Sequence, residues 1–158
     1  MAHTQLDQLD VKILQMMSGN ARKPFLEIAR ECGVSGAAVH QRIGKLQASG
    51  VIKGTEMLVE PSAIGYETCA YMGFFLKDPA SFNDVIEKLR DIPEVVECHF
   101  TTGQYDLFIK VFARNNDHLL HLIHEKLQNL GLSRTESLIS FKEVFKRPLP
   151  VDDTIARD

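Results

Sequence analysis

Hydrophobic residues in positions 1–50 recur at the three- and four-residue spacing of amphipathic helices. The pattern predicts three helices, which begin near Asp7, Pro24 and Ser35 because these residue types favour helix starts. Glycines at positions 33 and 50 end the second and third helices. The predicted core stripes are Leu9, Ile13, Met16 and Met17 in the first helix, Phe25, Ile28 and Ala29 in the second, and Val39, Ile43 and Leu46 in the third.

The second and third predicted helices are joined by Cys32-Gly33-Val34-Ser35, a connection typical of a helix-turn-helix. Because the apolar stripe of the third helix faces the core, its opposite face is expected to be exposed. That face offers small side chains with one amide, Gln41, and one amine, Lys45, which suits entry into the major groove and hydrogen bonds to base edges. A module that binds protein, with both polar side chains merely solvated, fits the same spacing. The predicted DNA-contacting residues are Ser35, Ala37, Ala38, His40, Gln41, Arg42 and Lys45.

Arg42 lies beside the core stripe of the third helix rather than on its outward face. Its long stem can pack against the core while the guanidinium reaches out. Two roles stay open: the group clamps a phosphate, or it pairs with Asp10 or Glu31 inside the domain.

Residues 66–147 have a different pattern, in which short alternating segments flank two helical ones. The order is βαββαβ, which predicts an antiparallel sheet with both helices on one face. Since the other face keeps many apolar groups and has no helix to cover it, the pattern predicts a dimer. Strands are expected at 68–76, 95–102, 107–113 and 136–144, and helices after Pro79 and from Asn115 or Asn116 to Leu130.

Charge and composition narrow the class of protein. The 158 residues are 44% hydrophobic and 25% charged, which is typical of a folded globular chain. Residues 1–54 carry seven basic and four acidic side chains, a net charge of +3, whereas the rest of the chain carries −6. A basic first domain on an acidic second one indicates that only the first meets a polyanion.

Nothing in the chain predicts a membrane span or export. No apolar run approaches the roughly 20 residues that cross a bilayer, and the N-terminus lacks the basic and apolar regions of a signal peptide. The three cysteines are scattered and match neither a disulfide framework nor a CxxC metal site. We therefore expect a cytoplasmic protein.

The segment Gly103-Gln104-Tyr105-Asp106 has the composition of a small-ligand loop. Glycine lets a backbone amide approach a ligand, tyrosine supplies a ring and a hydroxyl, and aspartate offers a carboxylate to an ammonium group. With Thr101 and Thr102 before it, the loop would suit an amino acid. The alternative is that glycine and aspartate are ordinary hairpin residues.

No cofactor, metal or enzymatic chemistry is predicted. Histidines 118, 121 and 124 sweep about 120° around one helix, so they cannot converge on one ion. Glycine-rich phosphate loops, a GxSxG elbow and an HExxH pair are absent from the sequence. A small enzyme and a sensing protein without DNA affinity are the alternatives to a DNA-binding regulator.

These residues resemble the Lrp/AsnC, or leucine-responsive, family of transcriptional regulators. The resemblance covers about residues 5–147. It rests on Leu6-Asp7-x-x-Asp10-x-x-Ile13-Leu14, Asn20-Ala21-Arg22, Ile28-Ala29, Gly33-Val34-Ser35, Val39-x-x-Arg42, Leu46, Gly50-Val51-Ile52-Lys53-Gly54, Pro61, Gly65 and Thr102-Gly103-x-x-Asp106. Thr55 departs from the pattern, because many members carry an aromatic residue there.

The resemblance implies an α+β protein: an N-terminal winged helix-turn-helix domain at 1–54, a strand linker at 55–65 and a ferredoxin-like βαββαβ domain at 66–147. Residues 148–158 are then expected to be an exposed tail. Family members pair as dimers through their sheets, often assemble into octamers, and bind amino-acid effectors between dimers. The implied effector-binding residues are Thr101, Thr102, Gly103, Tyr105 and Asp106, with Thr135 and Ser137 from a neighbouring subunit.

Overall fold

The structure is a computed structural model that describes residues 5–156 and divides into two compact units. The head unit combines the chain up to Met57 with the segment from Lys146 onward, and the sheet unit is Leu58–Phe145. Among the described residues, no helix is long and apolar enough to cross a membrane.

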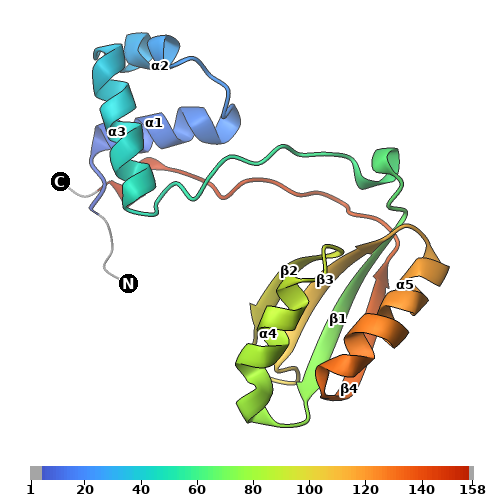
Figure 1. The fold of residues 1–158 in the computed structure, drawn as a ribbon. Coiled ribbons are helices and arrows are strands. Elements are labelled where there is room, and N and C mark those ends of the chain that lie inside the picture. The colour runs from blue at the N-terminus through green and yellow to red at the C-terminus, as the bar shows by residue number, and fades with distance from the viewer. Residues whose placement is uncertain (1–4, 157–158) are drawn as a thin grey trace. The chain divides into compact units, whose positions relative to one another are not determined.

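The head unit contains the three predicted helices: α1, Gln8–Gly19; α2, Phe25–Cys32; and α3, Gly36–Ala48 (Figure 1). Asp7 begins α1 with a capping box: its carboxylate accepts a hydrogen bond from the Asp10 amide at 2.9 Å, and the Asp10 carboxylate accepts one from the Asp7 amide at 3.2 Å. Ser35 caps α3 by accepting from the Ala38 amide at 3.1 Å. These local signals lie where the sequence predicts them.

Gly33 makes the tight turn between α2 and α3 possible. Its φ of +68° is in the left-handed region that side chains disfavour, and the next amide, of Val34, donates to the Ala29 carbonyl at 3.0 Å. The turn brings the apolar stripes of the helices together. The core of the head unit is Ile13, Ile28, Ala29, Val39 and Ile43.

The predicted strand linker is extended but unpaired within the single chain. Residues 53–60 are extended without strand pairing in the described chain, and Pro61–Ile64 form a short 3₁₀ turn. A strand needs a neighbour for its hydrogen bonds, and no described strand of this chain pairs with these residues.

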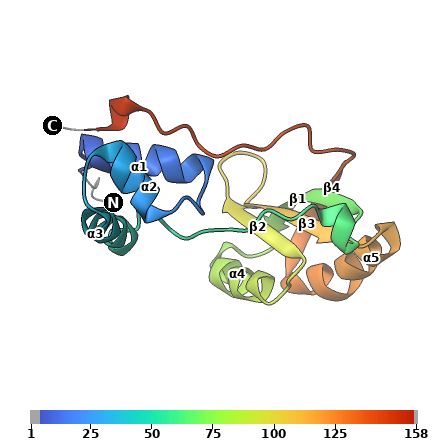
Figure 2. The ribbon, with the colours of Figure 1, turned by 90° about the horizontal axis from the view of Figure 1, so that it is seen from above.

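The C-terminal tail is exposed, as expected, but it belongs to the head unit. Its 3₁₀ turn, Asp153–Ile155, lies against α1 (Figure 2). The Gln15 side-chain amide donates to the Asp153 carboxylate at 3.0 Å. The tail therefore has a place in the fold that its weak hydrophobic pattern did not predict.

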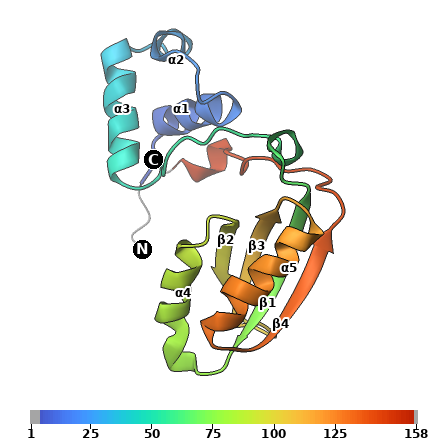
Figure 3. The same ribbon diagram turned by 45° about the vertical axis from the view of Figure 1, so that its right-hand side comes forward.

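The sheet unit has the predicted βαββαβ order, with strands β1, Thr68–Leu76; β2, Val95–Phe100; β3, Leu107–Ala113; and β4, Leu132–Ser140. The antiparallel sheet has the strand order β2-β3-β1-β4. Helices α4, Phe82–Arg90, and α5, Asn116–Leu122, lie on the same face (Figure 3). A wider π-helical turn at Ile123–Leu127 and a tighter 3₁₀ turn at Gln128–Leu130 continue α5.

Strand β4 begins and ends four residues before the predicted strand. Its register with β1 explains the difference, because Leu132 pairs with Leu76 and Ser140 with Cys69. Beyond Ser140 the neighbouring strand has almost no residues left with which to pair. The alternation of the sequence alone does not contain this limit.

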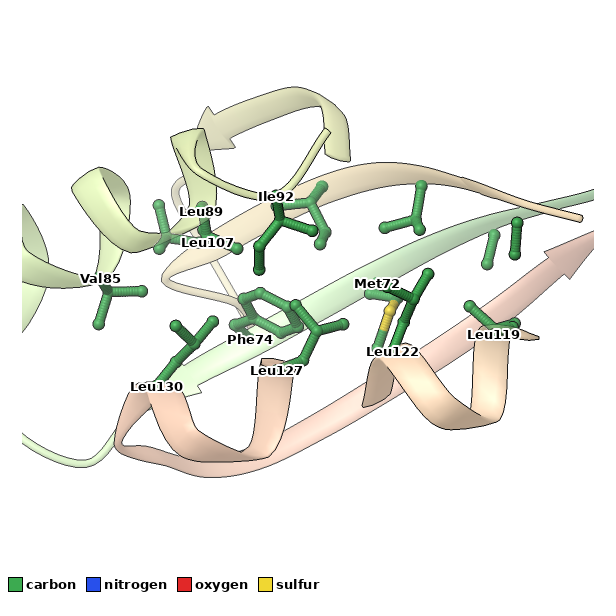
Figure 4. Close-up of a cluster of buried hydrophobic side chains, with 14 residues drawn as sticks. Met72, Phe74, Val85, Leu89, Ile92, Leu107, Leu119, Leu122, Leu127 and Leu130 are labelled. Atoms are coloured by element: carbon green, nitrogen blue, oxygen red, sulfur yellow. The ribbon is translucent and has the colours of Figure 1, made fainter. Parts of the chain in front are cut away.

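The core of the sheet unit lies between the sheet and its two helices. Met72 and Phe74 of β1 are fully buried against Leu89 of α4 and Leu122 of α5, as the close-up shows (Figure 4). Burying each such side chain contributes about 1.5–3 kcal/mol, so this layer holds the helices to one face.

The second face of the sheet, here the open face, is covered by no helix of the sheet unit. Its rings are in contact: Tyr71 and Phe108 stack with their centroids 5.9 Å apart. Lys110 lies among them, with its ammonium 5.3 Å from the Phe112 ring centroid. By strand register, the open face includes Tyr71, Gly73, Phe75, Phe108, Lys110, Phe112, Glu136 and Leu138.

Candidate nucleic-acid interface and ligand site

Helix α3 presents the expected outward face. Ala37, Gln41 and Lys45 are exposed, while Val39 and Ile43 of the same helix are buried in the core. No ion pair among the described residues involves Lys45. Its ammonium is therefore available to a base edge or a phosphate.

Three other predicted residues flank this face. Ser35 is exposed, but its hydroxyl is engaged as the cap of α3. Ala38 is half-buried in the first turn. His40 is exposed and meets Phe25 of α2 edge to face, with ring centroids 5.9 Å apart and planes at 65°. The neighbouring helix thus limits the positions of the imidazole.

Arg42 makes the internal pair that the sequence left open beside the phosphate clamp. Its guanidinium donates to Asp10 at 3.0 Å and also to Asp7. Hydrogen bonds to Asp7 and Asp10 raise the pKa of Arg42. The hydrogen bond from the Asp10 amide, followed by Arg42, lowers the pKa of Asp7 despite the opposing effect of burial. The capping box of α1 thus presents two carboxylates that hold Arg42, which favours the internal role.

The loop between β2 and β3 is held by its own main chain. Thr101 donates from its hydroxyl to the Tyr105 carbonyl at 2.7 Å and from its amide to the Asp106 carbonyl at 3.2 Å. Gly103 has a φ of +98°, which explains the glycine, and Thr102 is exposed beside it.

The carboxylate of Asp106 is engaged with the backbone. It accepts a hydrogen bond from the Leu76 amide at 2.8 Å, and the Asp106 amide donates to the Phe74 carbonyl at 2.9 Å. These bonds join the start of β3 to the end of β1. These bonds match the hairpin role that the sequence left open beside the role of ammonium partner.

Tyr105 lies flat on β1 over Gly73. A Cβ atom at position 73 would lie 2.3 Å from the tyrosine ring, so only glycine fits there. The ring also stacks with Phe108 at 5.8 Å and meets Phe75 edge to face at 5.4 Å. This packing aims the Tyr105 hydroxyl at β4.

Glu136 of β4 receives that hydroxyl. Tyr105 donates to its carboxylate at 2.6 Å, and the side-chain amide of Gln104 donates to the same oxygen at 3.3 Å. Arg134 pairs with its other oxygen. The hydrogen bond to Glu136, with burial, raises the pKa of Tyr105.

Thr135 and Ser137 do not join this cluster within one chain. They pair with Phe74 and Met72 and so share the helix-covered face, whereas Glu136 pairs with Gly73 and lies on the open face. Sequence reasoning missed Glu136. The alternation of a strand could have found it, because a residue between two candidates lies on the opposite face.

The two histidines of α5, His118 and His121, have separate partners. The ring of His118 accepts from the Arg114 amide at 3.1 Å, and His121 contacts Glu125 at 3.0 Å. Within residues 5–156 no group of three or more metal-ligating side chains is brought together.

Comparison with known proteins adds independent findings. Residues 6–53 match a winged helix-turn-helix DNA-binding domain, and residues 69–150 match the Lrp/AsnC ligand binding domain. The chain is 37% identical to regulatory protein AsnC of Haemophilus influenzae over 145 residues, which is 91% of this chain and 97% of AsnC.

Solved structures agree with these matches. The structure of E. coli AsnC has a TM-score of 0.86 and 35% identity, and the match covers 92% of this chain and 99% of that one. A complex of the transcriptional regulator NMB0573 with L-Met, from Neisseria meningitidis, has a TM-score of 0.86 at 24% identity, with 95% and 99% covered. The second likeness shows the fold.

Proposed function

Because this chain belongs to the Lrp/AsnC family of transcriptional regulators, we propose that it reads operator DNA with α3 and changes its assembly and DNA affinity when an amino acid binds the sheet unit. The observation that carries the proposal is the exposed face of α3 with Gln41 and Lys45, on a basic segment of an acidic chain. The protein acts by binding and not by catalysis, and it works in the cytoplasm, where the DNA is.

The DNA-contacting set follows from the exposure of α3. Gln41 and Lys45 contact base edges, and the small Ala37 and Ala38 let the helix backbone approach. Ser35 places the helix N-terminus, whose amides favour a phosphate, and His40 lies at the flank. Arg42 acts only by holding α3 to α1.

A matched pair of double variants tests this set. Gln41→Ala with Lys45→Ala removes one amide and one amine from the outward face of α3. Gln8→Ala with Lys12→Ala makes the same change on the exposed side of α1. Binding to promoter fragments at several salt concentrations should show that the first variant loses sequence preference and the second keeps it. Equal operator binding by both variants would refute the assignment of the face.

The effector site centres on Tyr105 and Glu136. The Glu136 carboxylate receives the ammonium of an amino acid, while exposed backbone amides near Thr102 and Gly103 receive its carboxylate. Thr101 and Asp106 hold the loop, so they shape the site without contacting the ligand. Thr135 and Ser137 contribute only from a neighbouring copy. The L-Met complex of NMB0573 supports an amino acid as the ligand class.

Calorimetric titration of the full chain with each common amino acid tests the site. Glu136→Gln should weaken binding of the effector about tenfold or more, because the ammonium loses its opposite charge. Glu143→Gln, also on the sheet unit, is the control. If Glu136→Gln binds every amino acid as the wild type does, the ammonium partner lies elsewhere.

We propose that two copies pair through their open faces and that such dimers assemble further, as octamers. Leu138 is 58% exposed beside the stacked rings of Tyr71 and Phe108, and a face of this kind is stable when a second sheet covers it. Light scattering should give at least a dimer mass for the wild type. Leu138→Glu should shift the mass toward the monomer, and a wild-type monomer at micromolar concentration would contradict the proposal.

A further inference from the structure

One hollow of the protein lies away from the open face. It is a groove of about 350 Å³ in the sheet unit between α4 and β2. Leu89 and Leu107, which are 2% and 0% exposed, form its floor. Phe100, which is 74% exposed, stands at its wall, and its ring meets Phe82 edge to face at 4.9 Å. The groove is therefore apolar below and open above.

Strand register separates this groove from the effector site proposed above. Cys98 and Phe100 pair with Ile109 and Leu107, whose side chains belong to the helix-covered core. Tyr105 and Glu136 belong to the opposite side of the sheet. A ligand in the groove would not touch either residue.

One positive charge is placed at the rim of the groove. Arg90, on the last turn of α4, lies close enough to the Cys98 thiol to oppose electrostatically the rise that burial causes in the pKa of that thiol. Its guanidinium pairs with Glu87 at 2.6 Å, and both side chains are more than two-thirds exposed. Such a surface pair contributes at most about 1 kcal/mol, so the guanidinium is free to exchange partners.

The negative charge near the groove points elsewhere. Glu97 lines the groove, but its carboxylate contacts Lys110 of the open face at 3.7 Å. Among the lining residues, Arg90 is thus the charged group left for a ligand. In addition, β2 is an edge strand of the described sheet. One row of its backbone amides therefore donates no hydrogen bonds to a neighbouring strand of that sheet.

We propose that this groove binds a small apolar monocarboxylate, such as a branched aliphatic acid. The carboxylate meets the Arg90 guanidinium and the hydrocarbon chain lies on Ile86, Leu89 and Phe100. The volume of the groove is at the small end of the range for ligand pockets, which begins at about 300 Å³. The lack of a free carboxylate at the groove disfavours amino acids, which carry an ammonium. This site is separate from the proposed amino-acid site and does not depend on it.

Cys98 allows a direct test, because it lies in the groove and is exposed. In the full chain carrying Cys32→Ser and Cys69→Ser, it becomes the remaining cysteine for alkylation by N-ethylmaleimide. The alkylation rate is measured against concentration of 4-methylpentanoate and of the neutral, nearly isosteric 4-methylpentanamide. We expect the acid to protect Cys98 with an affinity about tenfold or more above that of the amide.

Two variants complete the experiment. Arg90→Gln should remove the preference for the acid, whereas Arg114→Gln, an exposed arginine of the same unit outside the groove, should keep it. Phe100→Ala should weaken the protection of Cys98 by both compounds, whereas Tyr105→Phe should leave the protection by both unchanged. Three outcomes overturn the proposal: no protection by the acid, equal protection by acid and amide, or protection that rises with protein concentration alone. The last would show that a second copy covers the groove.

Discussion

Replacing Arg42 distinguishes sharply between a structural and a DNA-binding arginine. Its guanidinium holds Asp10, whose side chain is 4% exposed, and Asp7, whose side chain is 49% exposed. Arg42→Met keeps much of the apolar stem and removes the charge. The variant leaves the buried Asp10 carboxylate with a hydrogen bond from the Asp7 amide but without its cationic partner.

The magnitude follows from the burial of the three side chains. Breaking a fully buried ion pair costs about 3–5 kcal/mol, and a hydrogen bond to a charged group contributes about 1.5–3 kcal/mol. Arg42 is 32% exposed, so water screens part of its interaction. We therefore expect Arg42→Met to lower the free energy of unfolding by about 2–3 kcal/mol.

Two assays on the same protein separate the roles. Denaturant unfolding measures the stability of the variant, and operator binding against salt measures its phosphate contacts. We expect the stability loss above with an unchanged salt slope. Arg30→Met, at an exposed arginine of α2, should change the stability by no more than about 0.5 kcal/mol. A normal stability with a salt slope shallower by about 0.9 would refute the reasoning, because that is the signature of one lost phosphate contact.

Three other predictions concern the same residues and the effector loop. Gly73→Ala should destabilise the chain by about 1–3 kcal/mol and abolish amino-acid binding, because the new methyl group displaces the Tyr105 ring; melting and calorimetry measure both. Asp106→Ala should lower the free energy of unfolding by about 1–2 kcal/mol while binding of the effector persists. Asp106→Asn, which keeps an acceptor oxygen, should lower it less. Because the pKa of Asp7 is lowered from 3.8 in the folded chain, its contribution to stability is present above pH 4 and lost as the pH falls through the folded value. Between pH 6 and 2, the free energy of unfolding should depend less on pH in Asp7→Asn than in the wild type.

The sequence by itself determined the elements and their order. The three helices of the head unit follow from caps and apolar stripes such as those of Asp7, Ser35 and Val39, which act over one or two turns. The alternation of strands and helices likewise predicted the βαββαβ order and the helix-covered face. The unusual composition at Gly103 and Tyr105 also singled out a candidate ligand loop, whose role stays a prediction.

Only the tertiary structure decided which of those residues face each other. The partner of Arg42, the position of β4 and the docking of Asp153 on α1 each depend on contacts between residues that are far apart in sequence. Glu136 meets Tyr105 because the register of β4 against β1 places it opposite Gly73. Local patterns specify an element because caps and stripes act between near neighbours. Contacts between elements depend on register and packing, and a shift of one residue in register would turn every side chain of a strand to the opposite face. A single sequence therefore leaves these contacts open.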